Sequence, residues 1–294
     1  MNTNNFERWN LAWGSSWAYR LFQQHHRQIN SLYWSHIGVK NSAFQSTRKY
    51  TEEDPTSVLF QLSDPANKNL DIPLGEWSKN YSDFDNWVRL NALVGITGYL
   101  EVFFKTIIRA AIESDPSVLH GASRVVDGVV YLKSNPKYSL KEHADNVSIG
   151  DWNQRIVKYK KIFGTVPCVM EASVRELEDL RRTRNGVSHT FGRSSDDYDS
   201  IVDANAKPQK KISEEKLVKT LALIGKIAKE VEVDLASKHI GDFESVYFYH
   251  QWDKVIDPNH QTEPKVLKKK IGQLHGRSIG KEYFQELISY YNSL

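Results

Sequence analysis

The chain has 294 residues, of which 40% are hydrophobic and 26% are charged, and its formal net charge is +3. These values are typical of a globular protein with one large or two small domains, and they exclude general disorder and a strongly basic surface. The single cysteine excludes an intramolecular disulfide and a cysteine-rich zinc site. Because the N-terminus lacks a signal-peptide pattern and no apolar run approaches the ~20 residues of a membrane span, we expect a cytoplasmic protein with no membrane partner.

Residues 1–80 form a segment that is rich in aromatic side chains. The stretch FERWNLAWGSSWAYRLFQQHHRQINSLYW predicts helix in pieces, and the Pro-, Asp-, Asn- and Gly-containing stretch from Asp54 to Gly75 predicts loops. We expect the tryptophans of this segment to pack it against the main body of the protein. Stacking on nucleic-acid bases is the alternative role for these rings.

Residues 81–241 have the helical periodicity of an all-α domain. The longest predicted helix covers residues 84–113, and the sequence Ser-Asp-Pro ends it. Its apolar stripe contains one carboxylate and consists of Trp87, Leu90, Val94, Thr97, Glu101, Phe104, Ile108 and Ala111. A short helix, WNQRIVKYKKIF, is predicted to end at Gly164, a residue type common at helix C-termini.

Two further helices complete this predicted domain. One begins near Val169 and reads VMEASVRELEDLRRTRNGVSH, and the last begins after the N-cap residue Ser213 and stops by Gly241. Residues 242–294 are predicted to be a C-terminal extension that starts aromatic and turns basic. Its candidate RNA-binding residues, for which a solvated face is the alternative, are Lys268, Lys269 and Lys270.

Arg184 stands where the helical period predicts an apolar residue. It shares a stripe with Val174, Leu177, Leu180 and Val187. A buried guanidinium needs a carboxylate or a phosphate beside it, and Glu101 is the predicted carboxylate. Arg182 instead lies on the polar face, where Glu178 precedes it by four residues, so we expect a surface ion pair there.

Asn185 and His189 lie four residues apart and share a helix face. Asn185 and Gly186 are expected to loosen the helix end and to turn His189 toward Arg184. An arginine can hold two phosphate oxygens and stabilise developing charge, and a histidine can exchange a proton near neutral pH. Arg184, Asn185 and His189 are therefore candidate catalytic residues for a phosphodiester, with Arg182 in a supporting position.

The stretch RNGVSH, from Arg184 to His189, resembles the catalytic signature of HEPN-domain proteins, in which four to six residues stand between an Arg, often followed directly by Asn, and a His. The order of the predicted helices over residues 84–240 is similar to that superfamily, with an acid on a first long helix and the motif at the end of a later one. The stretch YKKIFG is similar to stretches of its bacterial and abortive-infection members. The resemblance implies an HEPN-like helical bundle and a homodimer in which two motif helices meet.

The resemblance also implies a metal-independent and cofactor-free endoribonuclease, with a role in stress or phage defence. The ribose 2′-hydroxyl would attack the adjacent phosphate, with His189 as acid or base. Arg184 would stabilise the charge, Asn185 would orient the substrate, and Glu101 would hold Arg184. Many HEPN toxins that pair with a nucleotidyltransferase antitoxin carry Tyr two residues after the motif His. Phe191 stands there in this chain, which argues against such a partner.

Other interpretations of the same residues remain open. Arg182 with His189 also fits the spacing of the signature. In a purely structural role, Arg184 would pair with Glu101 and His189 would cap its helix. The protein would then be a non-catalytic helical module that binds RNA, a nucleotide or a protein, or a scaffold that uses its aromatic N-terminal segment.

The remaining histidines do not predict a metal site. Arg20 with His25 or His26 fits the motif spacing as well, but QQHHRQ predicts a polar helix face at the surface. No Asp or Glu stands among His25, His26 and His36 to complete a ligand set.

Overall fold

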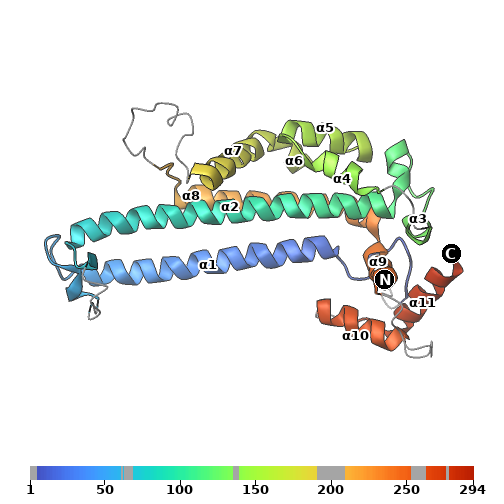
Figure 1. Ribbon diagram of the computed structural model, residues 1–294, viewed down its shortest axis with the longest axis horizontal. Helices are drawn as coiled ribbons and strands as arrows, with labels where there is room; N and C mark the ends of the chain where they lie inside the picture. The colour runs from blue at the N-terminus through green and yellow to red at the C-terminus, as the bar shows by residue number, and fades with distance from the viewer. Residues whose placement is uncertain are drawn as a thin grey trace. The chain divides into compact units, whose positions relative to one another are not determined.

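The computed structural model describes residues 5–60, 62, 69–134, 139–190, 209–252, 263–275 and 278–294 (Figure 1). Within these ranges the regular elements are helices, apart from an isolated bridge between Pro55 and Pro73, so the prediction of an all-α fold is confirmed. The α-helices are α1 (Trp17–Thr47), α2 (Leu74–Ser114), α3 (Gly128–Lys133), α4 (Lys141–Ser148), α5 (Trp152–Phe163), α6 (Cys168–Ala172), α7 (Val174–Thr190), α8 (Glu214–Leu235), α9 (Phe243–Gln251), α10 (Glu263–His275) and α11 (Lys281–Ser293). Shorter turns are the 3₁₀ helices Thr56–Val58 and Pro116–His120 and the π-helix Ala236–Ile240.

The chain forms two compact units, each assembled from separate parts of the sequence. The first contains Met1–Gln23, Leu100–Glu178 and Gly225–Leu294, and the second contains Gln24–Tyr99 and Asp179–Ile224. Helices α1, α2, α7 and α8 contribute residues to both units. This division differs from the predicted ranges 1–80, 81–241 and 242–294. The units divide inside long helices, and the amino-acid composition of a helix does not show where its packing partners change.

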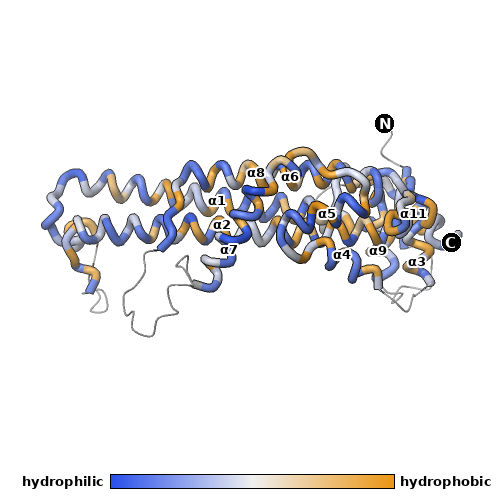
Figure 2. Tube along the Cα trace, turned by 90° about the horizontal axis from the view of Figure 1, so that it is seen from above, coloured by the Kyte–Doolittle hydropathy of each residue, from blue (hydrophilic) through white to orange (hydrophobic). Residues whose placement is uncertain are grey.

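In the second unit, the parts of α1 and α2 that belong to it run antiparallel and side by side (Figures 1 and 2). His25 stacks on Tyr99 with ring centroids 4.0 Å apart, and Phe44 lies 5.4 Å from Trp77 toward the other end of the pair. Tyr33 is buried between these contacts along α1. Aromatic packing therefore holds the two helices of this unit together.

This packing explains why two helices differ from their predicted bounds. α1 is one continuous helix of 31 residues, and α2 begins at Leu74 rather than at residue 84. Tertiary contacts here outweigh the weak helix propensity of the aromatic and polar residues. The predicted end of α2 is confirmed at Ser114. By length and composition alone α2 could cross a membrane, but 44% of its most apolar stretch is buried inside the protein, a property shared with the central helices of many globular domains.

In the first unit, acidic side chains from α8 and α9 hold the start of α1. Glu232 accepts hydrogen bonds from the backbone N–H and the hydroxyl of Ser16 at 2.6 and 2.5 Å, and Glu244 accepts from the N–H of Trp17 at 2.8 Å. The first N–H groups of a helix lack partners within the helix, so the side-chain oxygens of these two acids satisfy them. Trp13 is buried in the same unit, which confirms the predicted packing for this tryptophan.

Arg8 joins the N-terminal segment to two helix ends of the first unit. Its Nε lies 3.0 Å from Asp127 Oδ1, and its Nη1 donates to the Ile240 carbonyl at 2.8 Å. Its Nη2 donates to the carbonyl and the hydroxyl of Ser114 at 3.1 and 2.7 Å. Burial lowers the pKa of Arg8, and the nearby Asp127 carboxylate opposes this shift.

Two acids of the first unit make its stability depend on pH. Burial raises the pKa of Asp242 to about 7 and the pKa of Glu244 to about 8. Both values exceed those of carboxyl groups in an unfolded chain, so the folded state keeps protons that the unfolded state releases. The free energy of unfolding is therefore expected to fall as the pH rises from about 5 toward 8, with Asp242 alone contributing a loss of about 2 kcal/mol between roughly pH 5.5 and 7.

Urea unfolding at a series of pH values measures this dependence. Asp242→Asn removes one of the titrating groups and is expected to flatten the curve. Glu76→Gln, which changes an exposed carboxylate, is the control and should leave the slope unchanged. A free energy of unfolding that rises with pH over this range would contradict the raised pKa values.

Candidate functional site

α7 carries the predicted catalytic residues, and its predicted apolar stripe is confirmed. Leu177, Leu180 and Val187 are buried, and Arg184 is half-buried on the same stripe. Most of the other residues of this helix are hydrophilic (Figure 2). The guanidinium of Arg184 is thus partly withdrawn from water, a setting that strengthens its attraction for an anion.

The end of α7 is a regular helix. It continues through Gly186 to Thr190, so the loosening predicted at Asn185 and Gly186 does not occur. Burial of Val187 in the next position helps to offset the cost of about 1 kcal/mol that a glycine adds to a helix. His189 is exposed in the last turn, and Asn185 is half-buried one turn before it. The imidazole can therefore be reached from solvent.

Arg182 is exposed, as its polar position predicted, but its expected partner is placed differently. Glu178 is buried and accepts a hydrogen bond from the backbone N–H of Trp152 at 3.3 Å. A carboxylate is favourable there because Trp152 is the first residue of α5, at the positive end of that helix. The helical period alone does not reveal that a second helix begins against this side of α7, so the prediction of a surface position for Glu178 was wrong.

Lys210 is a basic residue of this site that sequence reasoning missed. Its ammonium donates to the hydroxyl of Thr183 at 2.7 Å, on the turn of α7 that carries Arg184. Asn86 of α2 holds this lysine's backbone, because its amide donates to the Lys210 carbonyl and accepts from the Ile212 N–H, both at 3.0 Å. The lysines before α8 were visible in the sequence, but a tertiary contact was needed to show that one reaches α7.

His36, one of the histidines of the N-terminal segment, is paired with the buried carboxylate of Asp85. Asp85 accepts hydrogen bonds from His36 at 2.9 Å and Lys40 at 2.7 Å, and it also pairs with Arg89. Burial raises the pKa of Asp85, but the hydrogen bonds from these three partners outweigh it, and the pKa lies below the usual carboxyl value. Across the described ranges, no group of three or more His, Cys, Asp or Glu side chains gathers as metal ligands would.

Glu101 lies on α2 and pairs with a residue other than the predicted one. Both Nη atoms of the buried Arg155 lie 3.3 Å from Glu101 Oε1. The same guanidinium stands 4.8 Å from the centroid of the Trp152 ring. Glu101 and Arg155 belong to the first unit and Arg184 to the second, so an additional pairing of Glu101 with Arg184 remains a prediction.

Two exposed aromatic side chains of α2 belong to the same unit as the motif. Phe84 and Trp87 stack with ring centroids 6.0 Å apart and planes 17° apart, and they are 47% and 41% exposed. Trp87 was predicted on the buried stripe, but burial along that stripe begins with Leu90. Asp83, one turn before Trp87, pairs with Lys211 at 3.7 Å. The stacked rings therefore offer a flat apolar surface with a lysine nearby.

The candidate RNA-binding lysines of α10 are not equivalent. Lys269 and Lys270 are exposed, whereas Lys268 is half-buried. Lys269 and Lys270 line a shallow hollow of about 430 Å³ together with Lys265, Val266 and Gln273. Phe191, at the position of the tyrosine of antitoxin-regulated relatives, lies outside the described residues.

No protein-family model, no curated protein and no solved structure matches this chain. The residues around the end of α7 form the candidate functional site. There the structure combines a half-buried arginine, an exposed histidine and a lysine from a distant part of the sequence.

Proposed function

We propose that the protein is a metal-independent endoribonuclease of the HEPN type, with Arg184, Asn185 and His189 as its catalytic residues. The observation that carries the proposal is the composition of one helix end. Arg184 is partly withdrawn from water, Lys210 reaches the same turn of α7, and His189 is open to solvent in the turn that follows. Two cations and an imidazole match the needs of phosphodiester cleavage.

In the proposed reaction, the ribose 2′-hydroxyl attacks the adjacent phosphorus and the 5′-oxygen of the next nucleotide leaves. His189 accepts the proton of the 2′-hydroxyl or delivers a proton to the leaving oxygen. Arg184 binds the non-bridging oxygens, whose charge grows in the transition state, and Lys210 adds a second positive charge nearby. Asn185 orients the phosphate through its side-chain amide. The products are a 2′,3′-cyclic phosphate and a free 5′-hydroxyl.

Two proton transfers in one step favour two copies of the site. One His189 per chain supplies one acid or base, so a homodimer that brings two α7 helices together would supply both. Contact between two motif helices through their apolar stripe would place Val174, Leu177 and Val187 against the second copy. Leu177 and Val187 are buried within their own chain, so the proposed contact instead uses exposed residues of α7 such as Ser188.

The proposed substrate is single-stranded RNA. Bases in a duplex already stack on one another, whereas an unpaired base can stack on an exposed aromatic ring. Phe84 and Trp87 supply such rings in the same unit as the C-terminal part of α7, and Lys211 lies beside them through its pair with Asp83. The phosphates of the same strand would reach Lys210 and Arg184.

Incubation of the purified protein with labelled RNA tests the proposal. Cleavage of an unstructured RNA is expected in the presence of EDTA, because the proposed groups need no metal, and the products are expected to end in a 2′,3′-cyclic phosphate. A perfect duplex of the same sequence is expected to resist cleavage. Products that end in a 3′-hydroxyl, or no cleavage of any single strand, would refute the proposed chemistry.

A helical module that binds RNA without cutting it is the second candidate. It would use the same cations, Arg184 and Lys210, and it would not need His189. RNA binding by a protein that never cleaves, with equal affinity in His189→Ala, would support this alternative.

The exposed lysines of α10 are expected to hold RNA phosphates away from the cleavage site. Replacing Lys269 and Lys270 with alanine should weaken RNA binding and reduce the slope of log affinity against log salt by about 0.7 for each lost contact with a single strand. The control replaces Lys226 and Lys229, two exposed lysines of α8 in the same unit. Fluorescence anisotropy over a range of salt concentrations measures the slope of log affinity against log salt for both double variants. Equal slopes would show that the lysines of α10 are solvated and do not contact RNA.

A further inference from the structure

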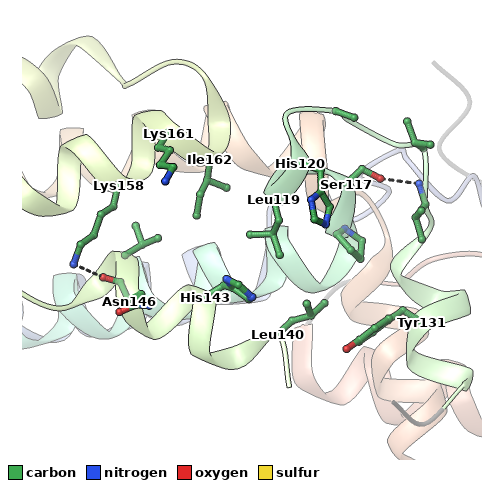
Figure 3. Close-up of a pocket in the computed structure, with 15 residues that line it drawn as sticks. Ser117, Leu119, His120, Tyr131, Leu140, His143, Asn146, Lys158, Lys161 and Ile162 are labelled. Atoms are coloured by element: carbon green, nitrogen blue, oxygen red, sulfur yellow. Dashed lines mark hydrogen bonds between the residues drawn. The ribbon is translucent and has the colours of Figure 1, made fainter. Parts of the chain in front are cut away.

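A groove in the first unit lies apart in sequence from α7 and its motif. It encloses about 950 Å³ between the 3₁₀ helix Pro116–His120, α4 and α5 (Figure 3). This volume lies within the range of sites for small organic ligands. Its apolar wall consists of Pro116, Leu119, Ala122, Val125, Val126, Leu140, Val147 and Ile162.

The polar lining of the groove is basic. His120, His143, Lys158 and Lys161 line it, and the described residues of its lining include no Asp or Glu. Lys158 is held in place, since its ammonium donates to the carbonyls of Asn146 at 2.9 Å and Ile149 at 3.3 Å. His120, His143 and Lys161 are exposed, and in Figure 3 the two imidazoles lie on opposite sides of Leu119. These groups would attract an anion.

One wall of the groove is a loop whose backbone is fixed in an uncommon conformation. Arg124 has a positive φ of 56°, which non-glycine residues rarely adopt. The buried Asp115 accepts from the Arg124 N–H at 2.8 Å, and the Arg124 guanidinium donates to the carbonyls of Ser237 and Lys238 at 2.5 and 2.8 Å. These anchors compensate a local strain, and strained residues of this kind concentrate at functional sites.

The anchored loop presents two valines to solvent at the edge of the groove. Val125 is 74% exposed and Val126 is 45% exposed. The Val126 N–H donates to the hydroxyl of Ser117 at 2.8 Å, so its position is fixed as well. A bound ligand with an apolar body would cover these side chains and remove them from water.

We propose that this groove binds a mononucleotide. The phosphate would lie against Lys161 and His143, and the base would lie between Leu119 and the valine edge. The polar groups are spread along the groove instead of standing at one end, which favours a nucleotide over a fatty acid. Tyr131 and Asn146 also line the groove, and their side chains can form hydrogen bonds with a base edge or a ribose. This proposal does not rest on the function proposed for α7.

Isothermal titration calorimetry with AMP, adenosine and inorganic phosphate tests the proposal. AMP is expected to bind most tightly, because it alone carries both the apolar body and the anion. Lys161→Ala and His143→Ala are each expected to weaken AMP binding by roughly tenfold, the effect of losing one charged hydrogen bond. The control is Lys160→Ala, which changes a neighbouring exposed lysine of α5 that does not line the groove. The affinity of this variant for AMP should stay within about twofold of that of the original protein.

Several results would overturn the proposal. One is the absence of binding by AMP, GMP, CMP and UMP at about 1 mM, the weak limit for a specific site. Another is inorganic phosphate binding as tightly as AMP, which would leave no role for the apolar wall. Loss of AMP binding in Arg184→Ala together with normal binding in Lys161→Ala would place the nucleotide at α7 instead. Circular dichroism of each variant shows whether the fold is retained.

Discussion

His189→Ala is expected to reduce RNA cleavage by about 10²- to 10⁴-fold, the usual contribution of a positioned acid or base. The imidazole is exposed in the last turn of α7, so its removal leaves the core intact, and the variant should unfold at the same temperature as the original protein. RNA binding should persist, because the arginine and lysine that hold phosphates remain. Cleavage and binding measured on the same preparation separate a chemical defect from a binding defect.

Arg184 and Arg182 form a matched pair that tests which arginine acts. Arg184 is half-buried on the apolar stripe and Arg182 is exposed, so Arg184→Ala should remove activity and Arg182→Ala should change it little. Arg184→Lys keeps the charge without the two-pronged geometry of a guanidinium and should restore only part of the activity. If Arg182→Ala alone abolishes cleavage, the longer-spaced pair of Arg182 and His189 is the catalytic one.

Arg8→Ala is expected to cost about 3–5 kcal/mol of folding free energy, which corresponds to a fall of roughly 10 °C in melting temperature. The substitution leaves the Asp127 carboxylate and the Ser114 and Ile240 carbonyls without the buried donor they now share. Arg8→Lys should recover little of this loss, because one ammonium cannot reach acceptors on three separate elements. Urea unfolding measures the change in free energy.

The control for Arg8 is Arg48→Ala, which removes an exposed arginine that directly follows α1. A surface substitution of this kind is expected to change the free energy of unfolding by less than about 0.5 kcal/mol. Equal stability of the two variants would mean that the guanidinium of Arg8 contributes no more than a solvated charge.

Helices with strong local signals could be predicted from the sequence. α5 ends before Gly164, which adopts a positive φ of 79°, and the N–H of Lys216 donates to the predicted N-cap Ser213 at 3.1 Å. Both signals act within a few residues of the helix end, so the sequence contains them in full. The extra turns of α2 depend on Trp77 meeting Phe44 from α1, and a local pattern contains no information about such a contact.

The residues of the candidate site also fall into two groups: those that local spacing identified and those that depend on tertiary contacts. Arg184, Asn185 and His189 lie on one helix, so their spacing sufficed to select them and to place Arg184 on the buried stripe. Lys210 could not be selected, because its approach to Thr183 depends on how Asn86 holds the segment before α8. The Arg155 partner of Glu101 was missed for a related reason: spacing on one helix says nothing about which cation arrives from another.

The two compact units are joined by unbroken helices, and this limits how the protein can vary. α2 passes from one unit to the other between Tyr99 and Leu100, and α1, α7 and α8 pass likewise in mid-helix. A residue inserted near such a crossing would turn everything beyond it by about 100° around the helix axis and exchange buried faces for exposed ones. We therefore expect that neither unit folds when it is excised as a module, and that length changes are tolerated better in the connections between helices.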